Sequence, residues 1–232
     1  DLITAGITER DKREVPEWEG PESDRLMWQQ RAQTNPVAFR QDLVQAFLGE
    51  GSLHSAQQQT LDLLDAGRSV LTVMGTGRGK SLIFQIHAAE LALGKQTASL
   101  FVYPLRALVA DQAFHLERTL GSFGITVGVL TGATSAPERA QVMADLVRGE
   151  VDIVLTTPEY LDFHVDELAK TSAIGFVVID EAHHVGTSKA GFRPSYTRLG
   201  SALQHLGNPQ VLAVTATADT AVAEEIRTAF SL

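Results

Sequence analysis

The sequence predicts an α/β protein, a parallel sheet with helices on both faces. From residue 53 onward, short β-branched apolar runs alternate with longer amphipathic segments, which is the pattern of such a sheet. One run, Phe176–Ile179, is apolar at every position, as expected of a strand buried on both faces. Glycine-rich and acidic segments directly follow two of these runs, at the positions where parallel sheets bind ligands.

The predicted elements follow one another without an internal repeat. We expect strands at Ser69–Met74, Ser99–Tyr103, Ile125–Leu130, Asp152–Thr156, Phe176–Ile179 and Val211–Thr215. We expect helices at Lys80–Leu93, Leu105–Leu120, Pro137–Val147, Pro158–Ala169, Tyr196–Leu206 and Thr220–Phe230. Together they predict one lobe over residues 51–232.

Residues 1–50 differ from the rest in being polar, charged and interrupted by prolines. The stretches Ser23–Ala32 and Pro36–Leu48 have helical character, so this region is expected to be a mostly helical N-terminal extension. Its two tryptophans, Trp18 and Trp28, are expected to pin the extension onto the lobe, because aromatic side chains mostly serve packing.

Composition narrows the class of protein. With 44% hydrophobic and 20% charged residues the chain is globular, and the net charge of −9 argues against a wholly basic nucleic-acid surface while leaving room for a local contact track. The chain has no cysteine, which excludes disulfides and favours a cytoplasmic location, nucleoid-associated in a bacterium. No apolar run reaches membrane-spanning length, and without an initiator Met the chain is expected to be part of a longer protein.

A glycine-rich segment follows the first predicted strand and opens a helix. It consists of Gly75, Thr76, Gly77, Arg78, Gly79, Lys80 and Ser81. Glycines let backbone N–H groups turn toward phosphate oxygens, Lys80 would reach the β and γ phosphates, and the Ser81 hydroxyl would bind Mg²⁺. Met74 stands where the strict pattern has its first glycine, so the segment alone also fits an ordinary glycine-rich turn.

Asp180-Glu181-Ala182-His183 follows the strand Phe176–Ile179. Asp180, expected on a strand beside the phosphate-loop strand, would hold Mg²⁺, and Glu181 would orient an attacking water. A solvated acidic turn is the alternative, but the pairing with Lys80 is far more specific than either motif alone. His183 and His184 lack a third ligand at a useful spacing, so zinc is not expected.

In six motifs the sequence resembles the first RecA-like lobe of RecQ-family DNA helicases of superfamily 2, from about Leu53 to Leu232. The matching segments are Gln57, which resembles the glutamine that reads adenine, Met74–Ser81, Tyr103–Gln112, Thr156–Leu161, Phe192–Tyr196 and Thr215–Asp219. Their order along the chain is that of the family, which makes coincidence negligible.

The resemblance implies ATP and Mg²⁺ as cofactors. It implies that Lys80, Asp180, Glu181 and His183 are catalytic residues. It also implies that Gln57 binds the nucleotide together with the glycine-rich loop. Nucleic-acid contact or coupling is implied for Pro104, Arg106, Gln112, Gly132, Thr157, Phe192, Arg193, Thr215 and Thr217. His183 and Thr217 would transmit the nucleotide state toward a DNA track along the opposite sheet edge, which would use main-chain N–H groups near Pro104, Arg106, Gly132 and Thr157.

The sequence departs from the family in two places. Glu50 and His54 stand where the family stacks adenine between an aromatic residue and an arginine, with Phe47 as a possible substitute. The loop 184–191 lacks the family's aromatic residues and has Ser188 where a Trp is expected. Base stacking is worth about 1–3 kcal/mol per base, so this loss predicts weaker coupling of DNA binding to hydrolysis.

The function that these observations favour is ATP hydrolysis that drives movement on single-stranded or partly duplex DNA. The partner expected within the same protein is a second RecA-like lobe carrying an arginine finger, so the isolated lobe is expected to be weakly active or inactive. An RNA-directed or protein-remodelling ATPase and a non-catalytic scaffold of the same fold remain as alternatives.

Overall fold

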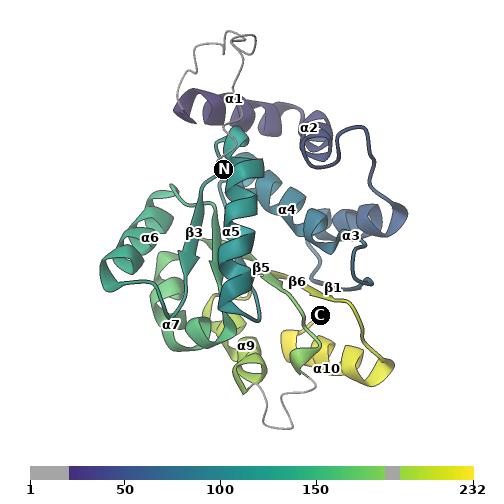
Figure 1. Ribbon diagram of the computed structural model, residues 1–232, viewed down its shortest axis with the longest axis vertical. Coiled ribbons are helices and arrows are strands. Elements are labelled where there is room, and N and C mark those ends of the chain that lie inside the picture. Colours follow the sequence, from purple (N-terminus) through teal and green to yellow (C-terminus); the bar gives the residue numbers. More distant parts are fainter. Residues whose placement is uncertain (1–20, 186–193) are drawn as a thin grey trace, which may run out of the picture.

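The computed structural model describes residues 21–185 and 194–232, and it confirms the predicted fold class. Its six strands form one parallel sheet in the order β1-β6-β5-β2-β4-β3. The strands are β1 (Val70–Val73), β2 (Ala98–Val102), β3 (Val127–Leu130), β4 (Ile153–Thr156), β5 (Ile174–Ile179) and β6 (Gln210–Thr215). The helices around them are α1 (Pro21–Thr34), α2 (Pro36–Leu48), α3 (Ser55–Asp65), α4 (Lys80–Glu90), α5 (Arg106–Leu120), α6 (Ala136–Arg148), α7 (Pro158–Thr171), α9 (Pro194–His205) and α10 (Thr220–Phe230) (Figure 1).

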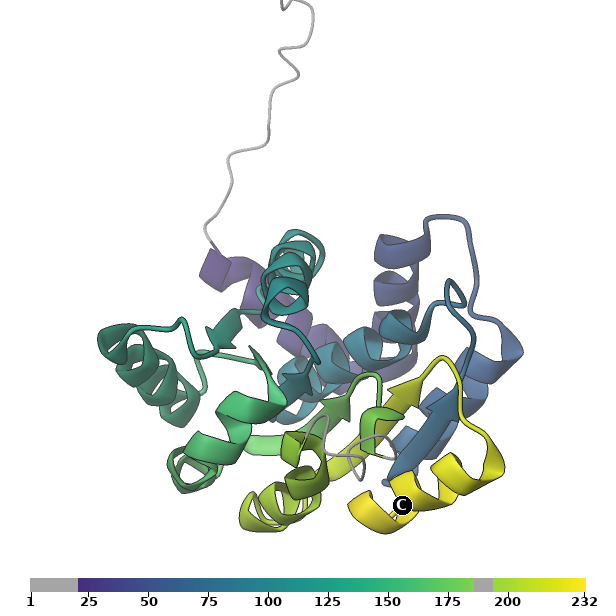
Figure 2. The ribbon, with the colours of Figure 1, turned by 60° about the horizontal axis from the view of Figure 1, so that its bottom comes forward.

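Two hydrophobic cores lie on opposite faces of the sheet. Successive residues of a strand point to opposite faces, so Phe176 and Val178 of β5 join one core while Val177 and Ile179 join the other. The first core is covered by α1 to α5 and the second by α6, α7, α9 and α10. Figure 2 shows this layering, with α5 (teal) above the sheet and α9 and α10 (yellow-green and yellow) below it.

The strand order corrects one prediction. We expected the strand that ends at Asp180 to lie beside the phosphate-loop strand, but β6 lies between β1 and β5. Val73 of β1 pairs with Thr215 of β6, and Ile179 of β5 pairs with Ala213 of β6. Periodicity reports which faces of a strand are buried but not which strand is its neighbour, so the sequence could not place β6.

Two helices differ from the prediction. No helix is predicted from the sequence for the Gln-rich segment Ser55–Asp65, yet it forms α3 and buries its own Leu61 and Leu64. The helix expected at Lys80–Leu93 ends its α-helical part at Glu90 and continues as a short π-helical segment, η2 (Leu91–Lys95). The remaining predicted elements are present, with their ends shifted by a few residues.

The helices α1 and α2 of the N-terminal extension pack onto the same core as the rest of the chain. Phe39 and Leu43 of α2 are completely buried there. Trp28 of α1 packs in a tilted arrangement against Phe123, with ring centroids 4.7 Å apart, and against Phe39 at 6.0 Å. Trp28 therefore pins the extension as expected, whereas Trp18 lies outside the described residues. Figure 1 shows α1 and α2 at the top of the molecule, beyond the ends of α5 and α4.

Candidate functional site

The predicted site residues lie along the carboxyl-terminal edge of the sheet, which the strand order divides into two halves. We call the edge of β1, β6 and β5 the phosphate-loop half and the edge of β2, β4 and β3 the far half. The phosphate loop, Thr215 and Asp180 lie in the first, because they end or follow β1, β6 and β5. Pro104, Thr157 and Gly132 follow β2, β4 and β3 and lie in the second.

The phosphate loop is an exposed turn between β1 and α4. Gly77 and Gly79 have φ angles of 75° and 71°, in the left-handed region that glycine tolerates best. The Arg78 N–H donates to the Gly75 carbonyl at 3.2 Å, which curls the loop, and Thr76 lies exposed within it. Within the described part of the chain no side chain caps α4, so its first N–H groups remain available to an anion, next to Lys80 and Ser81.

Gln57 of α3 ties that helix to the phosphate loop. Its side chain is almost completely buried, and its Nε2 donates to the Gly79 carbonyl at 3.0 Å. Its Oε1 accepts from the His54 N–H at 3.0 Å. An added Cβ at Gly79 would lie 2.5 Å from Gln57 Nε2, so a larger residue there would displace the Gln57 amide from this contact.

Glu50 and His54, which depart from the family near Gln57, lie in different surroundings. The His54 ring contacts the Arg78 carbonyl of the loop through Nε2 at 2.9 Å. Glu50 is exposed, and Phe47 packs against the hydrophobic core. His54 therefore supports the phosphate loop. From the sequence, His54 was notable only because it differs from the residue that the family has there.

Three hydrogen bonds hold Asp180 in place directly after β5. Its N–H donates to the Val102 carbonyl at 3.0 Å, its carbonyl accepts the Tyr196 hydroxyl at 3.1 Å, and its Oδ1 accepts the Glu181 N–H at 2.9 Å. Burial raises the pKa of the Asp180 carboxyl, and the positive charge of Lys80 acts in the opposite direction. A cation bound at this carboxylate would offset the cost of its burial.

A continuous chain of contacts leads from Glu181 across to β6. His183 Nδ1 lies 3.2 Å from Glu181 Oε2 and 2.9 Å from the Thr215 hydroxyl oxygen. The Thr215 hydroxyl donates to the Thr217 carbonyl at 3.0 Å, so His183 Nδ1 must carry the proton in the contact with Thr215. The Thr215 carbonyl in turn accepts the Met74 N–H at 3.0 Å, which places the same residue beside the start of the phosphate loop.

The far half presents backbone groups more than reactive side chains. Thr157 is buried and caps α7, its hydroxyl accepting the Tyr160 N–H at 3.3 Å. Arg106 and Gly132 are exposed, Pro104 is buried and Gln112 of α5 is half-buried. Phe192 and Arg193 lie outside the described residues.

Comparison with known proteins identifies the family. The model of the DEAD/DEAH box helicase family matches residues 54–226. The chain belongs to the DEAD/DEAH box helicase family. It is 33% identical, over 80% of its own length, to the ATP-dependent DNA helicase RecQ of Pasteurella multocida, of which it spans 28%. The resemblance to RecQ-type helicases seen in the motifs is thus matched by a curated relative.

Solved helicase structures share the fold. A crystal structure of the helicase MrfA bound to DNA superposes with a TM-score of 0.68 at 23% identity, over 82% of this chain and 26% of the other. A hypothetical ATP-dependent RNA helicase from Sulfolobus tokodaii gives a TM-score of 0.60 at 25% identity, over 81% of this chain and 54% of the other. At this level of identity the superpositions support the RecA-like helicase fold.

Two residues with no predicted role, Tyr196 and Ser195, also make hydrogen bonds at this site. Tyr196, quoted only as part of a motif, is fully buried and supports Asp180 from α9. Ser195 donates to Glu159 Oε1 at 3.0 Å and so joins α9 to the start of α7. Both residues lie in motif segments, and that placement was the signal that could have identified them.

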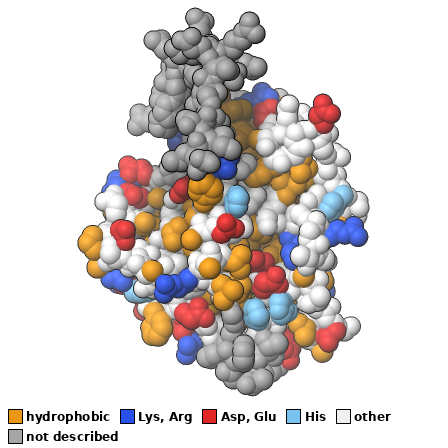
Figure 3. Space-filling model, in the orientation of Figure 1, with side chains coloured by type: hydrophobic (Ala, Val, Ile, Leu, Met, Phe, Trp, Pro, Cys, Tyr) orange, Lys and Arg blue, Asp and Glu red, His pale blue; other side chains and the backbone are white. Residues whose placement is uncertain are grey.

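The visible surface carries mixed charge. On the face shown in Figure 3, the described Lys and Arg side chains are scattered among acidic ones rather than gathered into one patch. This agrees with the net charge of −9. Among the described residues, no helix is long and apolar enough to cross a membrane.

Proposed function

We propose that this chain is the ATP-binding motor lobe of a RecQ-like, ATP-dependent DNA helicase or translocase. The lobe comprises residues 51–232 and is preceded by an N-terminal extension, residues 1–50, which contains α1 and α2. The observation that carries the proposal is the contact chain from Glu181 through His183 to Thr215, because it links a hydrolytic acid to the strand beside the phosphate loop.

The phosphate loop and α4 would bind the nucleotide. Backbone N–H groups of the loop Gly75 to Gly79 and of the start of α4 would donate hydrogen bonds to phosphate oxygens, and Lys80 would neutralise the phosphate charge. Gln57 would read the adenine, although its amide is engaged by the loop carbonyl and by His54 in this structure.

Asp180 and Ser81 fit a divalent metal site. Mg²⁺ prefers oxygen ligands, and the partly buried Asp180 carboxylate with its raised pKa is a group that gains from a cation. When bound there, Mg²⁺ would neutralise charge that develops on the phosphates. Glu181, next in the chain, would orient the attacking water by accepting its proton.

Glu181, His183, Thr215 and Thr217 would connect hydrolysis to movement. A change at Glu181 alters the partner of His183 Nδ1, and through the Thr215 hydroxyl it reaches the backbone at Thr217. In this proposal Thr215 and Thr217 report the state of the nucleotide to the rest of the protein.

The far half would hold the nucleic-acid backbone. Arg106 and the N–H groups at the starts of α5 and α7 and in the turn at Gly132 would meet phosphates; such contacts position a strand without reading its sequence. DNA is the favoured partner because the RecQ relative is a DNA helicase. RNA is the alternative, favoured by the similarity to a hypothetical RNA helicase.

A second RecA-like lobe is proposed as a partner within the same protein. The chain spans 28% of the length of its RecQ relative, so the activity of the whole protein depends on parts beyond this lobe. An arginine finger from such a lobe contributes on the order of 10³–10⁵ in rate, and we expect the lobe alone to hydrolyse ATP poorly.

The test is the ATPase of the full-length protein with single-stranded DNA, with RNA and without polymer. We expect DNA to stimulate hydrolysis more than RNA does, and Lys80→Ala to remove the stimulated activity. Stimulation by RNA alone would favour the RNA-directed alternative. A wild-type rate equal to that of Lys80→Ala under all three conditions would favour a non-catalytic scaffold.

A further inference from the structure

The helices α3 and α4 both begin at the phosphate loop and both end at one ionic cluster. α3 carries Gln57 in its first turn and ends at Asp65, and α4 runs from Lys80 to Glu90. At 1.5 Å per residue, the cluster lies about 12–15 Å along these helices from the loop. Their two ends are therefore linked through the helices themselves.

Arg40 of α2 joins the far ends of the two helices. Its guanidinium donates to both oxygens of Glu90, Nε to Oε1 at 2.6 Å and Nη2 to Oε2 at 2.5 Å. It also donates to both oxygens of Asp65, Nη1 to Oδ2 at 2.8 Å and Nη2 to Oδ1 at 2.9 Å. We call Arg40, Asp65 and Glu90 the Arg40 clamp. Burial raises the pKa of Glu90, and the hydrogen bonds and charge of Arg40 oppose that shift.

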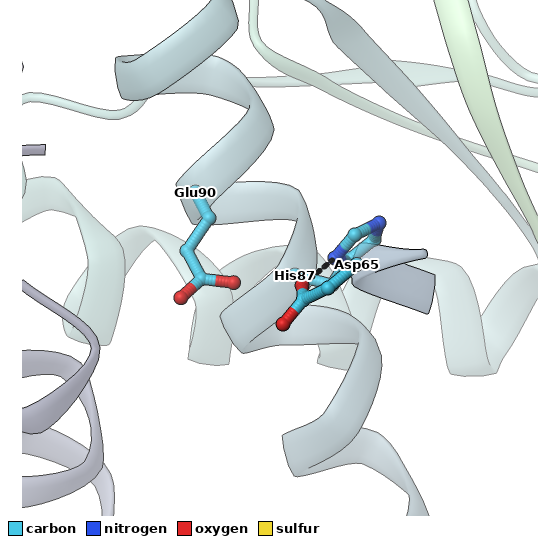
Figure 4. Close-up of side chains that lie close together, drawn as sticks. All are labelled: Asp65, His87 and Glu90. Atoms are coloured by element: carbon cyan, nitrogen blue, oxygen red, sulfur yellow. Dashed lines mark ion pairs between the residues drawn. The ribbon is translucent and has the colours of Figure 1, made fainter. Parts of the chain in front are cut away.

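A metal ion is the other cation that this cluster could suggest. Asp65, His87 and Glu90 each offer one ligand atom, and these atoms lie within 4.8 Å of one another (Figure 4). All four carboxylate oxygens of Asp65 and Glu90, however, already accept hydrogen bonds from Arg40. The guanidinium thus already supplies the positive charge, and a metal ion would have to displace it.

Residues next to the clamp on α3 and α4 also contact β6. His87 Nε2 contacts Gln210 Oε1 at 3.1 Å, and Gln210 Nε2 donates to the Leu64 carbonyl at 2.7 Å, one residue before Asp65. Gln210 begins β6, the strand that ends at Thr215. The ends of α3, α4 and β6 that lie away from the phosphate loop are therefore joined at this one place.

We propose that Arg40 is a positioning residue for the nucleotide site. By fixing the spacing between the ends of α3 and α4, Arg40 holds Gln57 against the Gly79 carbonyl at the opposite ends of the same helices. The α3–α4 pair is thus closed at both ends, by Gln57 at the loop and by Arg40 at the cluster. The inference rests on the proposed function, because it assigns a role in ATP binding to the N-terminal extension.

Arg31 provides a matched control within the extension. Its ion pair with Asp42 joins α1 to α2, whereas the ion pairs of Arg40 run from α2 to α3 and α4. Both arginines therefore stabilise the extension through carboxylates, but only Arg40 links it to the helices of the nucleotide site. A purely structural role of the extension would make the two substitutions similar.

The experiment compares Arg40→Gln, Arg40→Lys and Arg31→Gln in the full-length protein, by steady-state ATPase at saturating single-stranded DNA and by thermal melting. Elements coupled through packing shift affinities modestly, so we expect Arg40→Gln to raise KM for ATP about threefold to tenfold. We expect kcat to change less than about twofold, since Glu181, which follows β5, is not part of the clamp. Arg40→Lys, which keeps the charge but not the fork of donors, should give an intermediate KM.

The proposal is overturned if Arg40→Gln leaves KM unchanged, or if Arg31→Gln raises KM equally. Should Arg40→Gln fail to fold, Asp65→Asn removes the more exposed half of the clamp and should raise KM by a smaller factor. Direct binding of a fluorescent ATP analogue separates this proposal from the proposed function. If the wild type shows no stimulated ATPase, weaker analogue binding by Arg40→Gln but not Arg31→Gln still supports the clamp, and equal binding overturns it.

Discussion

In the phosphate-loop half of the sheet edge, hydrogen bonds join functional side chains of neighbouring strands, whereas in the far half the corresponding side chains bond to backbone. His183 follows β5 and contacts the hydroxyl of Thr215 on β6. In the far half, the Thr157 hydroxyl caps its own helix and Thr156 donates to the Leu130 carbonyl. The first half therefore depends on particular side chains, and the second presents mainly backbone N–H groups to a partner. Substitutions should be costly in the first half and mild in the second.

The largest effect is expected at Glu181. Glu181→Gln keeps the size and the hydrogen-bonding shape of the side chain but removes the base, so DNA-stimulated ATPase should fall by about 10²–10⁴. Nucleotide binding should persist, because the phosphate loop is intact. The measurement is steady-state ATPase together with binding of an ATP analogue. Glu150→Gln, in the turn after α6, is the control, and a Glu181→Gln variant with wild-type ATPase would contradict the assignment.

A smaller effect is expected at Thr215. Thr215→Val preserves the buried volume but removes the hydroxyl between His183 and Thr217, so stimulation of ATPase by DNA should drop about twofold to thirtyfold. Basal ATPase should change less than the stimulated rate does. Thr72→Val makes the same change on β1, where the hydroxyl lies 3.3 Å from the Thr60 hydroxyl, and should leave stimulation intact. Equal losses in the two variants would show that packing, and not the contact chain, is responsible.

In the far half, Arg106→Ala should weaken DNA binding only by a few-fold. If the Arg106 guanidinium meets one phosphate, its loss should lower the salt dependence of log affinity by about one unit and affect all sequences alike. Arg118→Ala, at the other end of α5 beside Phe114, is the matched control. The measurement is DNA affinity at several salt concentrations. If Arg106→Ala lowered DNA affinity by as large a factor as Glu181→Gln lowers ATPase, the contrast between the two halves would not hold.

The smallest effect is expected on the stability of the nucleotide-free protein. Burial raises the pKa of Asp180 above its value in the unfolded chain, so its contribution to stability is present at low pH and is lost as pH rises through the folded-state pKa. At neutral pH the ionised carboxylate is therefore destabilising. Asp180→Asn should raise the melting temperature by about a few degrees. The difference should shrink as pH falls. Mg²⁺ with an ATP analogue should stabilise the wild type more than the variant, and a variant less stable at neutral pH would refute the account.

Much of the fold and of the site was predictable because local pattern encodes it. The apolar run Phe176–Ile179 predicts a doubly buried strand, and residues at its end must lie at the ligand-binding edge whatever its neighbours are. The same reasoning placed Lys80 and Asp180 on one edge. It could not place β6 between their strands, because strand order depends on long-range packing.

The sequence alone determined the alternation of strands and helices, the phosphate loop and the acidic motif, because each of these depends on residues that are close together in the chain. Only the tertiary structure decided that the Gln-rich segment Ser55–Asp65 is a helix that buries Gln57 against the loop. It also decided that Arg40 meets Asp65 and Glu90, which are 25 and 50 residues away along the chain. Periodicity reports the burial of one element, whereas such contacts arise only when separate elements pack together.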